Sequence, residues 1–252
     1  MNQNKKFNIP KIIGHRGVKN LSPENTLQSI TKAFELGLKW VEVDVKISKD
    51  KIPFLLHDDD LERTTSGSGL ACKFDYFEIK KLDAGKYFFK ENTNIYPPTL
   101  EEVLNLCNIN KIGINIELKP NKGLEIRNVK EILKITKKFY KYVPLYFSSF
   151  DLESCIAIKK IIPNSKCGIL IEDFKTNNLE KILDLNNKYN FFSCGLDIEI
   201  INKELIYKLK DKNLIITVFS KNNITNEEAL YLWNMGVDSI FSDDPIDILK
   251  TE

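Results

Sequence analysis

The chain has 252 residues, enough for one large domain or two small ones. Hydrophobic residues make up 42% of it, and 37 basic side chains nearly balance 35 acidic ones, which leaves a formal net charge of +2. This excess of positive charge is too small to indicate binding to a nucleic acid or to an anionic membrane surface. No apolar run approaches the roughly 18 residues of a transmembrane helix, so we expect no stable membrane insertion.

The N-terminal residues and the cysteines bear on the compartment. No apolar segment of the kind found in secretory signals precedes residue 11. The cysteines form no CxxC pair, and their spacing fits neither a disulfide framework nor a zinc site. We therefore expect buried thiols in a protein of the cytoplasm. The cysteines are Cys72, Cys107, Cys155, Cys167 and Cys194.

Short β-rich apolar runs alternate with amphipathic stretches along the chain. Helical patterns lie between most runs; residues 24–37, for example, follow Ser22 as N-cap and Pro23 as first helical residue, and end at Gly37. This many β–α units predict a parallel sheet closed into a (β/α)8 TIM barrel, an α/β fold. The runs predict strands at 11–15, 40–47, 52–58, 112–118, 144–150, 166–172, 191–197, 213–219 and 238–243.

These candidate strands are one more than the barrel needs, and the link between the second and third explains the excess. Only about four residues, SKDK, join them, whereas a parallel crossover needs roughly a dozen. The third run should therefore return antiparallel as the second arm of a β-hairpin. With the turn centred near Lys49 and Asp50, His57 would lie opposite Glu42.

Residues 59–98 break the alternation. They hold loop-forming sequence and one short helical stretch around 76–82. About 40 residues are too few to indicate an independent core. We expect a small insertion that packs over one barrel end as part of the rim of the active site, within a single domain covering 1–252.

Charged and titratable side chains stand where four consecutive strands end. Two pairs, at positions 42 and 44 and at 117 and 119, alternate within a strand, so each pair shares one face. The C-terminal strand ends of such a barrel form its active site, so all of these side chains should converge. They are His15, Arg16, Glu42, Asp44, His57, Glu117 and Lys119.

Each of these residue types suits one part of phosphodiester cleavage. The three carboxylates are hard oxygen ligands for Mg²⁺ or Ca²⁺. A zinc site of two histidines and one glutamate would leave no imidazole for proton transfer. The arginine and the lysine suit phosphate oxygens, and the two histidines suit general acid–base catalysis. Any one of these residues alone fits a structural salt bridge equally well, and Asp58, Asp59 and Asp60 are more typical of a solvated loop. Burying seven such groups without a use would be costly.

A series of motifs resembles the glycerophosphodiester phosphodiesterases of the PLC-like phosphodiesterase group. HRG alone is a weak signal, but the whole ordered series is specific and runs over nearly the entire chain. The matching stretches are GHRG (14–17), PENT (23–26), VEVDV (41–45), LLHDDDLERTTSGSG (55–69), PTLEEVL (98–104), INIELK (114–119), SSF (148–150) and GVDSIFSDDP (236–245).

The resemblance implies hydrolysis of glycerophosphodiesters, such as glycerophosphocholine or glycerophosphoethanolamine, to sn-glycerol 3-phosphate and an alcohol. It also implies a barrel with a small insertion after the second histidine. The implied roles are a divalent metal, Mg²⁺ or Ca²⁺, on Glu42, Asp44 and Glu117, acid–base catalysis by His15 and His57, and phosphate binding by Arg16 and Lys119.

The last strands depart from the family pattern. Relatives often carry Trp-Thr-Val-Asn where this chain has Ile216, Thr217, Val218 and Phe219. A Trp face there would hold glycerol or the alcohol by packing or by cation–π contact, so the departure concerns the substrate pocket and not the chemistry. Phe219 either replaces part of that surface or belongs to the core.

Two other functions are compatible with the same barrel. One is a lysophospholipase D-like phosphodiesterase, for which the aromatic residues of the insertion would face lipid. The other is a catalytically silent barrel that binds phosphodiesters, which the complete set of histidines and carboxylates disfavours. The residues leave open the ion, the alcohol, the oligomeric state, and attack by water or by the glycerol 2-hydroxyl through a cyclic phosphate. The acid and base roles also stay open, with a preference for His15 as base because Arg16 keeps it near the phosphate.

Overall fold

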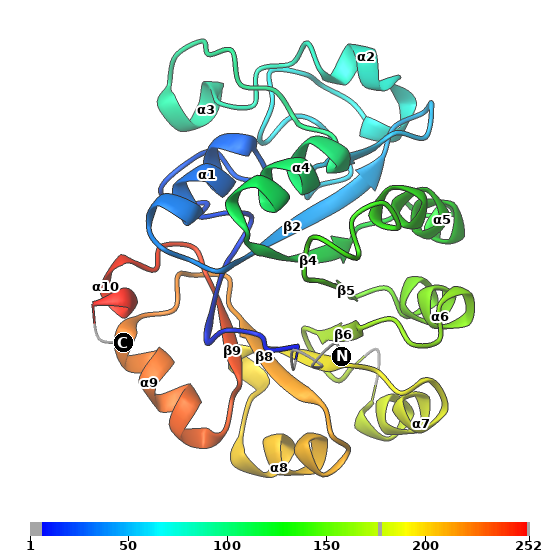
Figure 1. Cartoon of the computed structure of the whole chain (residues 1–252), viewed down its shortest axis with the longest axis vertical. Coiled ribbons are helices and arrows are strands. Elements are labelled where there is room, and N and C mark those ends of the chain that lie inside the picture. The colour runs from blue at the N-terminus through cyan, green and yellow to red at the C-terminus, as the bar shows by residue number, and fades with distance from the viewer. Residues whose placement is uncertain (1–6, 176–177, 251–252) are drawn as a thin grey trace.

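Eight parallel strands form a closed barrel in the computed structural model, which describes residues 7–175 and 178–250 (Figure 1). They follow one another around the ring in chain order, and β1 pairs with both β2 and β9 to close it. The predicted TIM barrel is confirmed. The expectation of no N-terminal leader concerns residues 1–6 among others, and these lie outside the described residues. The barrel strands are β1 (Ile12–Gly14), β2 (Trp40–Ile47), β4 (Gly113–Leu118), β5 (Leu145–Ser149), β6 (Cys167–Ile171), β7 (Ser193–Asp197), β8 (Ile215–Phe219) and β9 (Ser239–Ser242).

The extra strand, β3 (Pro53–Leu55), runs antiparallel to β2 on its outer edge, as the short link predicts. Its register differs from the prediction by one residue, because Ile47 pairs with Pro53 and the strand ends before His57. The Ser48 N–H donates to the Ile52 carbonyl at 3.1 Å, which closes a loop over residues 49–51 in place of a two-residue turn. The expectation that His57 lies opposite Glu42 is therefore wrong.

Helices cover the outside of the barrel (Figure 1). The first begins later than predicted, because Thr26 is its N-cap and Ser22 and Pro23 lie in the preceding loop. Thr26 and Ser29 form a capping box, which satisfies backbone donors at the helix start. Glu24 and Asn25 therefore stay outside the helix, where their side chains reach Arg16 and Asp44. The helices are α1 (Leu27–Glu35), α4 (Leu100–Asn110), α5 (Glu125–Thr136), α6 (Leu152–Ile161), α7 (Leu179–Tyr189), α8 (Lys203–Asp211), α9 (Asn226–Met235) and α10 (Ile246–Leu249), with a 3₁₀ turn η2 (Ile198–Ile200).

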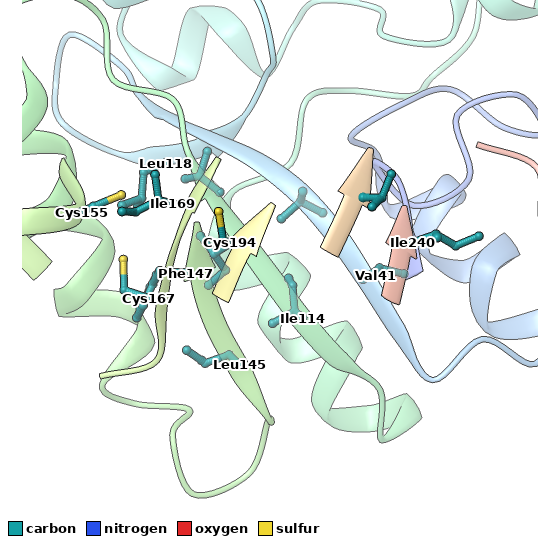
Figure 2. Packing of buried hydrophobic residues seen from close by; sticks show 14 of the residues in the cluster. Val41, Ile114, Leu118, Leu145, Phe147, Cys155, Cys167, Ile169, Cys194 and Ile240 are labelled. Carbon is teal, nitrogen blue, oxygen red and sulfur yellow. The ribbon is translucent and has the colours of Figure 1, made fainter. Parts of the chain in front are cut away.

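The hydrophobic core has two layers. The outer layer lies between strands and helices, and Figure 2 shows part of it, including Val41, Ile114 and Phe147. The inner layer fills the barrel, where Trp40 and Tyr146 pack with ring centroids 5.8 Å apart. Four of the five cysteines are buried and Cys72 is half-buried, all as free thiols. No helix in the described parts of the chain has the length and apolar character needed to cross a membrane.

The insertion holds η1 (Ala71–Lys73), α2 (Tyr76–Ile79) and α3 (Lys86–Phe89), and α2 is shorter than the predicted stretch. Its small apolar cluster includes Phe54 and Leu56 of the hairpin, so the insertion shares its core with that hairpin. The Tyr76 hydroxyl lies 3.1 Å from the Pro97 carbonyl, near the end of the insertion, and 3.4 Å from Glu102 Oε2 on α4, and so fastens the insertion beside that helix. α2 and α3 lie together at one end of the molecule (Figure 1).

Candidate active site

A pocket of about 530 Å³ opens among the predicted site residues. Asp44 does not line it but lies fully buried on β2, beside two residues that do, Glu42 and Glu117. The structure therefore brings together all seven residues that the strand ends predict. The predicted residues that line the pocket are His15, Arg16, Glu42, His57, Glu117, Lys119 and Phe219.

The three carboxylates form one buried cluster, with one ligand atom from each lying within 4.8 Å of the others. Burial, together with the charges of Asp44 and Glu117, raises the pKa of Glu42 well above its ordinary value. Burial also raises the pKa of Glu117. Burial opposes the ionised form of Asp44 as well, but Arg16 and Lys119 outweigh it and lower that pKa.

This cluster fits a divalent cation. Glu42 Oε1 is buried and accepts no hydrogen bond, which is costly for a carboxylate oxygen unless a ligand takes its place. Three converging oxygen donors suit a hard ion such as Mg²⁺ or Ca²⁺. Nothing in the donor set selects between the two ions.

Two cations lie beside the carboxylates. Arg16 Nε lies 3.2 Å from Asp44 Oδ2, and its backbone N–H donates to Glu42 Oε2 at 2.9 Å. Lys119 Nζ lies 2.7 Å from Glu117 Oε1 and 4.9 Å from the ring centroid of Phe150. Both cations therefore reach the pocket wall next to the acidic cluster, where a phosphate oxygen can meet a bidentate fork and a point charge.

Both histidines are held through Nδ1 by a carboxylate. His15 Nδ1 lies 2.6 Å from Asp243 Oδ1, and His57 Nδ1 lies 2.6 Å from Asp58 Oδ1. Despite partial burial, hydrogen bonds from Arg63 and His57 lower the pKa of Asp58 to about 2, and the contact with His15 lowers that of Asp243. Ionised carboxylates only accept hydrogen bonds, so Nδ1 donates and Nε2 is left for the pocket. Burial lowers the pKa of both histidines.

Gly17 and Asn25 fix the loop that carries Arg16. Gly17 has φ +84°, and a Cβ there would lie 2.6 Å from the Ser29 carbonyl carbon, so only glycine fits. Asn25, at φ 56°, donates through Nδ2 to Asp44 Oδ2 at 2.8 Å and accepts from the Asp44 N–H at 3.0 Å. Both motifs, GHRG and PENT, thus serve the acidic cluster.

Sequence reasoning missed five polar residues around the site. Asp243 and Asp58 hold the histidines, and Asn25 holds a carboxylate, as described above. Glu24 and Arg63 join Asp58 to Arg16 through hydrogen bonds. All five lie inside the motif stretches, and that position was the only sign in the sequence that they belong to the site. Their residue types and spacing did not indicate which partners they contact. They are Glu24, Asn25, Asp58, Arg63 and Asp243.

The two residues of β8 that depart from the family pattern lie in different places. Phe219 lines the pocket and packs edge-on against Phe150, with ring centroids 5.3 Å apart. Ile216 is fully buried in the outer core layer, away from the pocket. Ile216 therefore has no part in the pocket surface, because alternate residues of a strand face opposite sides.

Comparison with known proteins gives consistent matches over nearly the whole chain. Residues 15–247 match the glycerophosphoryl diester phosphodiesterase family. A glycerophosphodiester phosphodiesterase of Caldanaerobacter subterraneus is 31% identical, with 93% of this chain and 94% of the relative covered. One from Bacillus altitudinis is 30% identical, with 94% and 96% covered.

Solved structures agree. A phosphodiesterase of Oleispira antarctica, in complex with the product sn-glycerol-3-phosphate, superposes with a TM-score of 0.88 at 32% identity over 96% of both chains. A glycerophosphodiester phosphodiesterase of Thermotoga maritima gives 0.77 at 26% identity, with 97% of this chain and 99% of the other covered. The chain therefore belongs to the glycerophosphoryl diester phosphodiesterase family and is a phosphoric diester hydrolase.

Proposed function

We propose that the protein is a metal-dependent glycerophosphodiesterase that converts glycerophosphodiesters, such as glycerophosphocholine, to sn-glycerol 3-phosphate and an alcohol. The observation that carries the proposal is the convergence of a three-carboxylate cluster, two cations and two histidine–aspartate pairs on one pocket. The Oleispira relative holds sn-glycerol-3-phosphate as its product, which supports glycerol 3-phosphate as the phosphate-bearing product of this protein.

The site residues divide the reaction between them. A divalent ion held by the carboxylate cluster would polarise a phosphoryl oxygen as a Lewis acid. Arg16 and Lys119 bind the remaining phosphoryl oxygens and offset the negative charge that grows there in the transition state. Water or the glycerol 2-hydroxyl attacks phosphorus, and the same residues serve either route. Detection of a cyclic glycerol phosphate by phosphorus NMR during turnover would establish the second.

The two histidines take different proton steps. His15 Nε2 lies 3.9 Å from Glu42 Oε2, against the acidic cluster, and the His15 side chain is 15% exposed. The His57 side chain is 31% exposed, more than that of His15, so we place the departing alcohol on the His57 side of the pocket. We assign His15 as the base that takes the proton of the nucleophile and His57 as the acid that protonates the leaving oxygen.

Release of glycerol 3-phosphate from glycerophosphocholine tests the function. The assay is run with EDTA and then with Mg²⁺ or Ca²⁺ restored. We expect release only with the ion, and none from a Glu117→Gln variant under the same conditions. Ion-independent release would contradict the metal proposal, and no release under any condition would contradict the substrate.

One observation favours a second candidate, a lysophospholipase D-like activity. Four aromatic side chains of the insertion are exposed, and three of them lie on the single turn α3. Exposed aromatic residues of this kind suit a lipid surface. Comparing hydrolysis of a micellar lysophospholipid with that of glycerophosphocholine separates the two. The aromatic residues are Phe77, Tyr87, Phe88 and Phe89.

A further inference from the structure

Arg63, in the first loop of the insertion, binds two carboxylates at once. Its Nη1 and Nη2 donate to Glu24 Oε2 and Oε1 at 2.8 and 2.9 Å. Its Nε and Nη2 donate to Asp58 Oδ2 and Oδ1 at 2.5 and 3.1 Å. One planar guanidinium thus forms two forked pairs, a geometry in which arginine gains both energy and direction.

Each of these carboxylates also holds a residue of the site. Asp58 Oδ1 accepts from His57 Nδ1 at 2.6 Å, and Glu24 Oε1 accepts from Arg16 Nη1 at 2.8 Å. The imidazole and the phosphate-binding guanidinium are therefore positioned against one common group. The insertion, coloured cyan to green in Figure 1, follows the β2–β3 hairpin in the chain, and His57 and Asp58 lie just after the end of β3 at Leu55.

Arg63 itself does not touch the reacting atoms. It is absent from the lining of the pocket, and 46% of its side chain is exposed. An exposed salt bridge contributes little to stability by itself. Arg63 makes four hydrogen bonds to Asp58 and Glu24, and these carboxylates also bond His57 and Arg16, which points to a role in orienting these two side chains.

We propose that Arg63 is a positioning residue through which the insertion holds His57, by way of Asp58, in line with the leaving oxygen, while Glu24 holds Arg16 on the phosphate. This inference rests on the proposed function, in which His57 donates a proton from Nε2 as the P–O bond breaks and its electron pair stays on the leaving oxygen. A lysine cannot replace Arg63, because a single ammonium lacks the fork that joins two carboxylates.

Two substrates distinguish the positioning of His57 by Arg63 from a simpler role in which Arg63 only attaches the insertion to the barrel. In glycerophosphocholine the leaving alkoxide needs a proton, whereas in the p-nitrophenyl ester of glycerol 3-phosphate the leaving phenolate does not. For Arg63→Met we expect kcat on glycerophosphocholine to fall about tenfold or more and kcat on the aryl ester to fall less than about threefold. Arg63→Lys should lower the first rate similarly, since the charge alone does not restore the fork.

A matched control loosens the insertion without touching Arg63. Tyr76→Phe removes the hydroxyl that bonds the Pro97 carbonyl and Glu102 of α4, so it should lower Tm and leave the ratio of the two rates unchanged. An unchanged ratio in Arg63→Met, whether or not both rates fall, would overturn the positioning role. Wild-type enzyme that turns over neither substrate with metal present would instead overturn the proposed function, which keeps the two failures apart.

Discussion

His15 Nδ1 lies 2.6 Å from Asp243 Oδ1, although the two residues are 228 positions apart in the chain. The pair forms because β1 and β9 are neighbours where the barrel closes, with Gly14 opposite Ser242 just before the two side chains. The first and last strands thus complete one histidine–aspartate unit. The other unit, His57 with Asp58, is built from adjacent residues.

The His15–Asp243 pair should matter for kcat more than for binding. Asp243→Asn keeps an oxygen near Nδ1 but removes the charge that fixes the tautomer and favours the protonated ring. We expect kcat to fall about 10–100-fold with little change in KM. Steady-state kinetics on glycerophosphocholine measure both, and an unchanged kcat would show that His15 needs no carboxylate partner.

Metal affinity should rise with pH. Metal ligation needs ionised carboxylates, and burial together with its acidic neighbours raises the pKa of Glu42 well above its ordinary value of 4.5. Below that raised pKa a proton competes with the ion. We expect the rise in Tm caused by saturating Mg²⁺ or Ca²⁺ to be larger at about pH 8 than at about pH 5.5. An equal rise at both values would contradict the raised pKa.

The raised pKa of Glu42 also predicts how the stability of the metal-free protein changes with pH. A carboxyl group with a raised folded pKa binds more protons folded than unfolded, so the free energy of unfolding falls as pH rises from 4.5 to the folded value. Glu42→Gln removes that charge. We expect the metal-free variant to be more stable than the wild type near pH 8 by about 1–3 kcal/mol, and to gain nothing from metal. Urea denaturation with and without the ion measures both effects.

The sequence predicts the barrel and the seven site residues because alternation within a strand and the position of strand ends are local properties. Glu42 and Asp44 must share a face wherever β2 lies, and Glu117 lies beside Asp44 once β2 pairs with β4. The convergence of these three carboxylates then follows from topology alone.

The supporting contacts could not be predicted in this way. Glu24 and Arg63 lie in loops 39 residues apart, and no periodicity relates two loops. The register of β3 was missed because side-chain bonds of Ser48 selected a longer turn than the link length suggested. The start of α1 was missed because Ser22 and Thr26 are both good N-caps, and only the tertiary contacts of the PENT loop decide between them.

Asn25 should control metal affinity without being a ligand. Its amide bonds both the side chain and the backbone N–H of Asp44, so it sets the direction of that carboxylate. Groups that orient ligands typically change affinity about 10–100-fold when removed. We expect Asn25→Ala to weaken Mg²⁺ or Ca²⁺ binding by this factor, measured by calorimetry. An affinity equal to that of the wild type would show that Asp44 is oriented without the amide.

Gly17 should be intolerant of any side chain. Its φ of +84° disfavours other residues, and an added Cβ would also lie 2.3 to 2.6 Å from atoms of Ser29, one of them backbone. We expect Gly17→Ala to lower the free energy of unfolding by about 3 kcal/mol or more. Gly37 is the matched control, since its φ is +89° but no atom lies within 4 Å of an added Cβ.

Gly37→Ala should therefore cost only the backbone strain, about 1 kcal/mol. The difference between the two variants in urea denaturation isolates the contact with Ser29, which packs the loop carrying His15 and Arg16 onto α1. Equal losses in the two variants would mean that the loop moves away from α1 at little cost. In that case Gly17→Ala should still lower kcat, because the shift displaces Arg16 from the position in which we propose that it binds the phosphate.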